Sequence, residues 1–255
     1  MNTHREEWYA EWFNNTYLKV YAHRNARLAE SEVRFVTQVL GLRTDDSILD
    51  LCCGAGRHLF EMYRLGYSRV FGLELSPDLL KVASQNLEKK GCLVRGDMRN
   101  LPLREKSFRA VLSLFTSFGY FREEDENLRV LKEMRRVLVP GGRVLLDLVS
   151  YGVADRLVPE SERTIEGIKV TEKRRYNPDN RRIEKEITVS GPEKTEHFVE
   201  SVRVYTFAEI NQLFAGAEIA LEAIYGDFQG TPFHPSGERM IVIGTRLSVP
   251  AYLVT

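Results

Sequence analysis

The chain has 255 residues, enough for one large α/β domain or two small ones, and its 43% hydrophobic and 28% charged residues are ordinary for a globular protein. Its 36 basic and 36 acidic residues cancel, so no net field would attract nucleic acid or an anionic membrane. Three cysteines are too few for a disulfide framework, no signal-peptide pattern is visible, and no apolar run reaches the ~18 residues of a membrane span. We therefore expect a cytoplasmic protein.

The N-terminal segment carries apolar side chains at steps of three and four residues, which favours a single helix with one apolar face. These residues are Trp8, Trp12, Phe13, Tyr17, Leu18 and Tyr21. A second helix is expected from about 28 to 40, where Gly41 would end it. The aromatic stripe has two interpretations, packing on the core or a lid that closes over a ligand.

Residues 48–58, I-L-D-L-C-C-G-A-G-R-H, are typical of a strand, a tight turn and a helix, because an apolar run ends in glycines. Gly54 and Gly56 can adopt positive φ and let a ligand approach the backbone, and the following helix N-terminus suits an anionic group. Leu59 takes the place of the third glycine of a dinucleotide fingerprint, and no P-loop lysine follows. The turn is a candidate cofactor cradle, although such glycine pairs also occur in loops that bind nothing.

The stretch D-L-C-C-G-A-G resembles the first motif of class I S-adenosylmethionine (SAM) methyltransferases, an acid followed by G-x-G-x-G. Asp50 matches the acid, and Gly54 and Gly56 match the second and third glycines, whereas Cys52 stands where the first glycine is usual. The resemblance covers about residues 45–150 closely and 206–247 in outline. It implies SAM as the cofactor and a doubly wound α/β fold, a Rossmann-like seven-stranded, mostly parallel sheet with an antiparallel last strand.

Two acids follow at the expected carboxyl ends of the next two strands. Glu74 lies 18 residues after Gly56, a spacing at which a carboxylate can bond both hydroxyls of a ribose. In the family, an acid placed like Asp97, followed by a residue placed like Met98, clasps adenine. The alternatives are a solvated strand end for Glu74 and an ordinary turn residue for Asp97.

The resemblance also implies a set of site residues. Those expected to bind the cofactor are Tyr17, Tyr21, Asp50, Cys52, Gly54, Gly56, Glu74, Leu75, Asp97, Met98, Leu114 and Phe115. In the family, the segment like 116–121, T-S-F-G-Y-F, faces the transferred methyl, and the expected substrate-pocket residues are Phe118, Tyr120 and Tyr151. No metal site is expected.

The second half of the core follows the same family. L-K-E-M-R-R-V-L-V-P-G-G-R at 131–143 resembles the family's link between a helix, here about 123–138, and strand five. Thr206 and Glu209 form a capping box that starts a helix ending near 214. Two strands then close the chain.

Between these parts, three alternating strands are expected at about 164–176, 181–190 and 195–205. We interpret them as an antiparallel insert. The runs K-R-R and R-R within it invite an RNA-binding interpretation, but 162–186 holds eight basic and six acidic residues, a net charge of two. The expected domains are an N-terminal helical lid at 1–41, a SAM-binding core at 42–150 and 206–247, and the antiparallel β insert at 151–205.

The expected activity is methyl transfer from SAM to an oxygen or nitrogen of a small molecule, with the protein supplying alignment and desolvation. An RNA or protein methyltransferase and a non-catalytic SAM-binding module stay open as alternatives. An acceptor that must lose a proton would benefit from a general base, and His23 and His234 are the candidates, although each is more often structural or solvated. The oligomeric state, monomer or homodimer, is left open.

Overall fold

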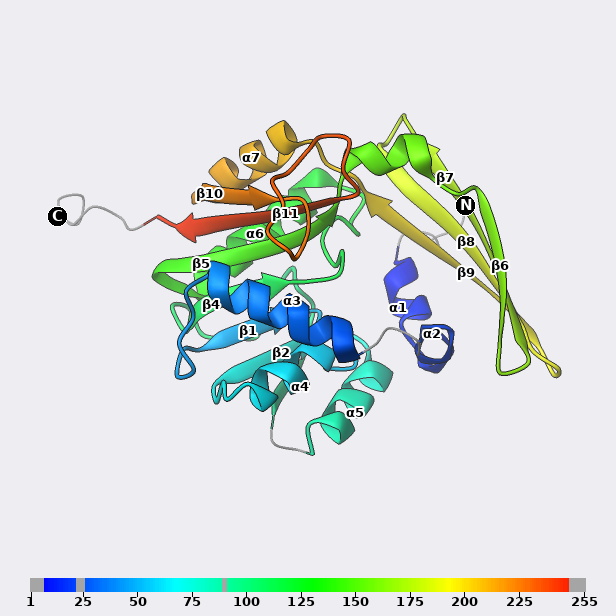
Figure 1. Ribbon diagram of the computed structural model, residues 1–255, viewed down its shortest axis with the longest axis horizontal. Helices are drawn as coiled ribbons and strands as arrows, with labels where there is room; N and C mark the ends of the chain where they lie inside the picture. Colours follow the sequence, from blue (N-terminus) through cyan, green and yellow to red (C-terminus); the bar gives the residue numbers. More distant parts are fainter. Residues whose placement is uncertain (1–6, 22–25, 89–90, 248–255) are drawn as a thin grey trace.

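The computed structural model describes residues 7–21, 26–88 and 91–247 and contains two β-sheets (Figure 1). The larger sheet has seven strands in the order β10-β11-β5-β4-β1-β2-β3. They are β1 Ile48–Leu51, β2 Val70–Glu74, β3 Cys92–Arg95, β4 Phe108–Ser113, β5 Leu138–Val149, β10 Ile219–Tyr225 and β11 Arg239–Arg246. Strands β1 to β5 pair in parallel, and β11 pairs antiparallel with β5 and β10. The predicted sheet is confirmed.

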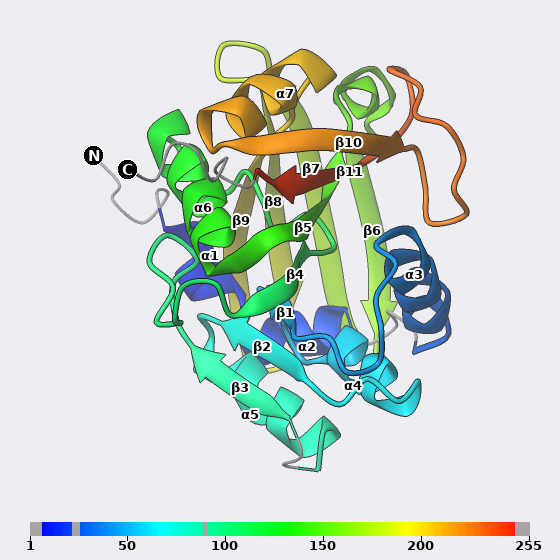
Figure 2. The same ribbon diagram turned by 90° about the vertical axis from the view of Figure 1, so that its left-hand side faces the viewer.

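Helices cover both faces of this sheet, as a doubly wound fold requires (Figure 2). They are α3 Ala26–Val39, α4 Arg57–Arg64, α5 Pro77–Asn86, α6 Glu124–Val137 and α7 Phe207–Gly216. Successive β1 residues face opposite layers, since Ile48 packs in the cluster with α3 and α4, and Leu49 packs in the cluster with α6 and α7. No helix within the described ranges is long and apolar enough to span a membrane.

Two helix starts follow their sequence signals. The Ser76 hydroxyl accepts a hydrogen bond from the Leu79 backbone N–H at 3.2 Å, and Pro77 is the first residue of α5. At α7, the Thr206 hydroxyl accepts from the Glu209 N–H at 3.3 Å, and the Glu209 carboxylate accepts from the Thr206 N–H at 2.8 Å. The predicted capping box is confirmed.

The single N-terminal helix expected from the aromatic stripe is wrong, because the segment forms α1 Trp8–Trp12 and α2 Asn15–Val20. Asn14 separates them, and its side-chain oxygen accepts from the backbone N–H groups of Thr16 and Tyr17 at 2.7 and 3.2 Å. Asparagine favours this N-cap role over a helix interior, because its amide competes for backbone hydrogen bonds.

The insert is a separate antiparallel sheet of four strands, in the order β6-β7-β8-β9. They are β6 Glu160–Ile165, β7 Ile168–Asn177, β8 Arg182–Ser190 and β9 Thr195–Arg203, preceded by a 3-10 helix at Tyr151–Arg156. The predicted single strand at 164–176 is wrong, because a two-residue turn interrupts it. Glu166 and Gly167 both have positive φ, 49° and 80°, as a hairpin turn of the primed type requires.

The two N-terminal helices lie between the insert and the large sheet (Figure 1). Helix α1 contacts β9, and the side chain of Trp12, which is fully buried, packs its ring 4.5 Å from that of Phe198. The aromatic stripe therefore belongs to a core that the insert completes.

Gly72, in the middle of β2, offers a test of this packing. A Cβ there would lie 2.5 Å from Leu59 Cδ1 and 2.7 Å from Cys53 Sγ, both closer than real contacts allow. We expect Gly72→Ala to lower the free energy of unfolding by about 1–3 kcal/mol in urea titrations, because neighbours in a dense core must shift. Gly191→Ala, whose Cβ would meet its nearest atom at 3.7 Å, is the control and should change little. Equal losses in the two variants would contradict the packing argument.

Candidate functional site

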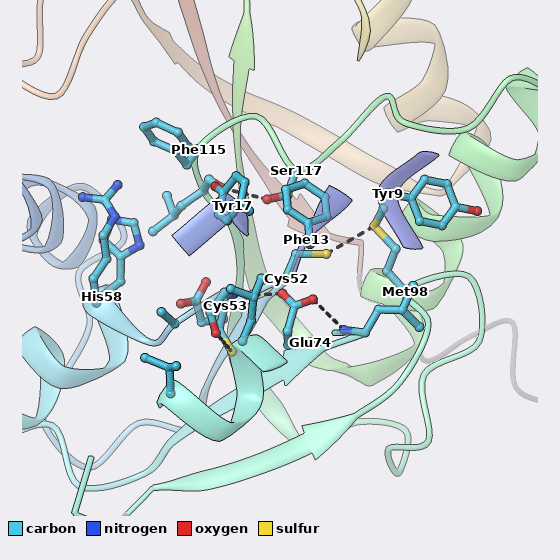
Figure 3. A pocket seen from close by; sticks show the side chains of 18 of the residues that line it. Tyr9, Phe13, Tyr17, Cys52, Cys53, His58, Glu74, Met98, Phe115 and Ser117 are labelled. Atoms are coloured by element: carbon cyan, nitrogen blue, oxygen red, sulfur yellow. Dashed lines mark hydrogen bonds between the residues drawn. The ribbon is translucent and has the colours of Figure 1, made fainter. Parts of the chain in front are cut away.

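A cavity of about 410 Å³ lies at the carboxyl ends of β1, β2 and β4, under α1 and α2. In Figure 3, the rings of Phe13, Tyr17 and Phe115 lie on the upper side of this pocket and Glu74 lies below. The predicted cofactor-binding residues that line it are Tyr17, Tyr21, Asp50, Cys52, Gly54, Glu74, Leu75, Asp97, Met98, Leu114 and Phe115. Tyr120, predicted for the substrate pocket, lines the same cavity.

The glycine turn has a left-handed backbone at three alternate residues, with φ of 62° at Cys52, 56° at Gly54 and 78° at Gly56. A Cβ on Gly54 would meet nothing within 4 Å, so this glycine opens onto the cavity. Gly56 does not line the cavity, because it caps α4 and a Cβ there would lie 3.1 Å from the Cβ of Ala83. Gly54 therefore leaves open space beside the backbone, and Gly56 allows close packing of α4 against α5.

Glu74 holds this turn in place. Its Oε2 accepts from the backbone N–H of Gly54 at 3.0 Å, and its Oε1 accepts from those of Leu75 and Ser76 at 2.8 and 2.9 Å. Burial raises the pKa of the Glu74 carboxyl, and the three backbone hydrogen bonds oppose that shift. A carboxylate has about four lone-pair positions, so acceptor capacity is left for a ligand hydroxyl.

Two buried polar atoms at the cavity wall have no hydrogen-bond partner within the described part of the chain, Asp50 Oδ2 and Arg57 Nη2. Asp50 is 1% exposed, and burial raises its pKa to about 7. Arg57 pairs through Nη1 with Glu32 at 2.8 Å, and its guanidinium lies 5.2 Å from the ring centroid of Phe115. An unsatisfied acceptor and an unsatisfied donor in one cavity match a ligand that carries both an ammonium and a carboxylate.

Asp97 is held more tightly than the sequence suggested. Its carboxylate accepts from the Arg99 guanidinium at 2.6 Å and from the Arg99 backbone N–H at 2.8 Å. Although burial acts to raise it, these hydrogen bonds hold the pKa of Asp97 below its ordinary value. Arg99 is also bound to Glu126 at 2.6 Å. An adenine contact would share this carboxylate with Arg99.

Phe115 and Thr116, after β4, both have a φ of 61°, a costly conformation for residues with side chains. Asp147 holds both, because its Oδ2 accepts from the Phe115 N–H at 2.8 Å and its backbone oxygen accepts from the Thr116 N–H at 3.0 Å. Arg239 donates to the same Oδ2 at 2.7 Å. Burial raises the pKa of Asp147 to about 6. This strained turn fixes the Phe115 side of the cavity.

The structure places several predicted residues away from the cavity. Phe118 is 1% exposed and packs against Tyr205 at 5.7 Å between ring centroids, and Tyr151 is a half-exposed residue beside Tyr176. These two residues were predicted for the substrate pocket, but neither lines the cavity. His234 is exposed and bonds Ser236 at 2.6 Å in a loop that does not line it either. His23 lies outside the described residues.

Sequence reasoning missed other residues of the wall. These are Tyr9, Phe13, Leu18, Cys53, Ala55, Arg57, His58, Leu79, Val82, Asn86, Gly96, Ser117 and Phe121. His58, which bonds Glu32 at 2.7 Å, is buried, and burial lowers its pKa against the opposing effect of Glu32. One signal in the sequence could have predicted Arg57 as a wall residue, namely its position directly after the glycine turn. The first turn of the helix that follows such a turn faces the bound ligand.

Comparisons with known proteins agree with this geometry. The methyltransferase-domain family matches residues 48–142. A dTDP-3-amino-3,4,6-trideoxy-alpha-D-glucopyranose N,N-dimethyltransferase from Streptomyces venezuelae is 29% identical over 83% of this chain and 89% of its own length. A demethylmenaquinone methyltransferase from Lactococcus lactis is 38% identical over 42% of this chain and 43% of its own length. The structure of SAM-bound CalS10, an amino pentose methyltransferase from Micromonospora echinaspora, superimposes with a TM-score of 0.67 at 27% identity, covering 89% of this chain and 96% of its own.

The sheet order, the glycine turn and these matches together show that the chain belongs to the class I SAM-dependent methyltransferases. It is an enzyme of the small-molecule type, and SAM is its cofactor. The predicted family, enzyme class and cofactor are confirmed.

The adjacent cysteines give a matched test of the turn. Cys52 stands at positive φ where the family usually has glycine, so Cys52→Gly should relieve strain and change the free energy of unfolding by less than about 1 kcal/mol. Cys53 is 7% exposed, packs in the core and has no such strain, so Cys53→Gly should cost about 1–3 kcal/mol. Thermal unfolding of both variants decides this, and a larger loss at Cys52 would show that its thiol packing outweighs the strain.

Proposed function

We propose that this enzyme methylates the amino nitrogen of a small molecule, with a nucleotide-linked amino sugar as the preferred acceptor. The observation that carries the proposal is the aromatic wall, the rings that line the cavity opposite the acidic strand ends. These rings are Tyr9, Phe13, Tyr17, Tyr21, Phe115, Tyr120 and Phe121. Aromatic faces attract cations, so such a wall favours a reaction whose product is an ammonium.

The polar groups at the opposite wall suit the cofactor. Asp50 and Arg57 would hold the ammonium and the carboxylate at its amino-acid end, because each has one unsatisfied polar atom there. Glu74 would accept from the ribose hydroxyls, and Asp97 would lie beside the adenine. The open face of Gly54 leaves room for the ligand to approach the backbone.

Bound SAM supplies a methyl group already activated by its sulfonium. The residues of this chain then align the acceptor, exclude water and surround the developing ammonium with aromatic faces. His58 is committed to Glu32. We therefore favour a mechanism in which an amine enters in its neutral form and positioning, rather than a histidine base, accounts for catalysis.

The alternatives have less support. Several basic residues of the insert have acidic partners, as Arg175 has Glu184 at 2.5 Å and Arg163 has Glu172 at 3.1 Å, which weakens the positive field that an RNA backbone would need. A quinone acceptor rests on the relative from Lactococcus lactis, whose match covers less than half of either chain.

The free thiols of Cys52, Cys53 and Cys92 suit a reducing compartment, and we keep the cytoplasm as the proposed location.

Mass spectrometry after incubation with SAM and dTDP-3-amino-3,4,6-trideoxy-α-D-glucopyranose tests the acceptor class. We expect one or two additions of a methyl mass on the sugar nitrogen, and none with the matching 3-hydroxy sugar nucleotide. A demethylated menaquinone and a small structured RNA serve as competing acceptors. Transfer to either of these, with none to the amine, would overturn the proposal, and so would SAM binding without transfer to any of these acceptors.

Asp50 makes the cofactor affinity depend on pH. Its pKa is raised to about 7 in the free protein, and a ligand ammonium beside it would favour the ionised form. SAM affinity, measured by calorimetry, should therefore rise about tenfold between pH 5.5 and 7, and Asp50→Asn should flatten this dependence. Asp45→Asn, at an exposed carboxylate, is the control. A slope that survives in Asp50→Asn would remove Asp50 from this role.

Asp50 also makes the stability of the ligand-free protein depend on pH. This stability should fall as the pH rises, whereas the affinity for SAM should increase. A carboxyl group whose folded pKa lies above its unfolded value favours the folded state most at low pH, and this contribution is lost as the pH rises through about 7. SAM should thus stabilise the protein more at pH 7 than at pH 5.5.

A further inference from the structure

The insert contacts the aromatic wall of the pocket from two directions, and the first is through α1 and α2. The Trp12 indole N–H donates to Glu200 at 2.6 Å, the Thr16 hydroxyl donates to Glu196 at 3.1 Å, and the Tyr21 hydroxyl donates to Glu172 at 3.0 Å. All three carboxylates belong to strands of the insert. The N-terminal helices and their C-cap residues, which carry four of the seven rings of the aromatic wall, are therefore hydrogen-bonded to the insert.

The second contact is made by Arg182, the first residue of β8. Its guanidinium donates to the carbonyl oxygens of three consecutive residues, Gly119 at 3.0 Å, Tyr120 at 2.7 Å and Phe121 at 2.9 Å. It also donates to the hydroxyl of Ser201 on β9 at 2.7 Å. The side chain is 5% exposed, so the R-R pair that suggested RNA contacts contains a buried arginine.

The loop that Arg182 holds lies directly against the insert. The Gly119 carbonyl also accepts from the Arg203 backbone N–H at 2.9 Å, and a Cβ on Gly119 would lie 2.9 Å from the Arg203 carbonyl oxygen. Gly119 has a φ of 92°, which only glycine adopts readily. The guanidinium is a planar fork with five donors in fixed directions, two more donors than a lysine ammonium has, so it can bond these carbonyl oxygens and the Ser201 hydroxyl at once.

The residues held in this way face the acceptor side of the pocket. Tyr120 and Phe121 line the cavity, and their rings meet those of α1, with Trp8 4.7 Å from Tyr120 and Tyr9 5.6 Å from Phe121. The cofactor side is built differently, since the turn at Gly54 is held from within the large sheet by Glu74. The insert therefore supports the aromatic wall of the pocket.

We propose that Arg182 is a positioning residue that sets the acceptor wall, and that the insert is the scaffold of acceptor specificity. This inference rests on the proposed function for the assignment of the aromatic wall to the acceptor. Arg182 acts through the Tyr120 and Phe121 backbone and does not touch substrate or cofactor. Its substitution changes acceptor binding and leaves cofactor binding intact.

The chain provides a reporter that needs no acceptor. Its two tryptophans, Trp8 and Trp12, both lie in α1, and Trp8 packs on Tyr120. Acrylamide quenching of tryptophan fluorescence therefore measures how well the aromatic wall is closed. The affinity for SAM, measured by calorimetry, reports on the opposite wall of the same pocket.

The test compares Arg182→Lys with Arg181→Lys, a control at the preceding residue, whose half-exposed side chain pairs with Glu209. We expect the quenching constant of Arg182→Lys to rise about twofold or more, while its SAM affinity stays within about twofold of the wild type, since only one wall loses its support. With the amino sugar nucleotide, kcat/KM for the acceptor should fall about tenfold or more, mainly through KM. The control should match the wild type in all three measurements.

Unchanged quenching and acceptor KM in Arg182→Lys would overturn the proposal, and so would a loss of SAM affinity as large as the loss in acceptor kcat/KM. If Arg182→Lys does not fold, Ser201→Ala is measured in its place, because it removes the hydroxyl that orients the guanidinium Nε. The same direction of change is then expected, and no change overturns the proposal. If the wild type methylates no amino sugar, the proposed acceptor fails, but quenching and SAM affinity still decide the role of Arg182.

Discussion

The buried carboxylate of Glu74 is the constraint on which the cofactor side of the molecule depends. It binds the backbone of the glycine turn after β1 and of the two residues between β2 and α5. Two segments that meet at the edge of the sheet thus share one acceptor group. Removing it would leave three backbone donors without their buried acceptor, so we expect the turn geometry and the cavity to be lost together.

The aromatic wall of the pocket is built from rings that also form the core. Trp12 is fully buried, while Tyr17, 5.5 Å from it between ring centroids, lines the cavity. The N-terminal stripe therefore divides between rings packed in the core and rings that line the cavity, and its closure as a lid stays a prediction. Any movement that opened the pocket would also expose core surface, which couples ligand access to stability.

The sequence predicted the large sheet and its ligand edge, because glycine turns and strand-end acids such as Asp50 and Glu74 are local signals. It missed what depends on side chains from distant segments. The helix break at Asn14 and the hairpin turn at Glu166 have only weak local sequence signals, and each lies inside a strong periodic pattern. The burial of Arg182 depends on contacts with a loop 61 residues earlier in the chain. Phe118 is expected in the pocket because the family's corresponding segment faces the transferred methyl, yet its ring packs in the core.

The bond from Trp12 to Glu200 joins residues 188 positions apart. During synthesis, the aromatic helices emerge before the insert, so their hydrogen bonds to Glu172, Glu196 and Glu200 can form only after β7 and β9 have been made. Contacts of such sequence separation form slowly, because a long loop must close before they form. The aromatic wall of the pocket is consequently completed late in folding.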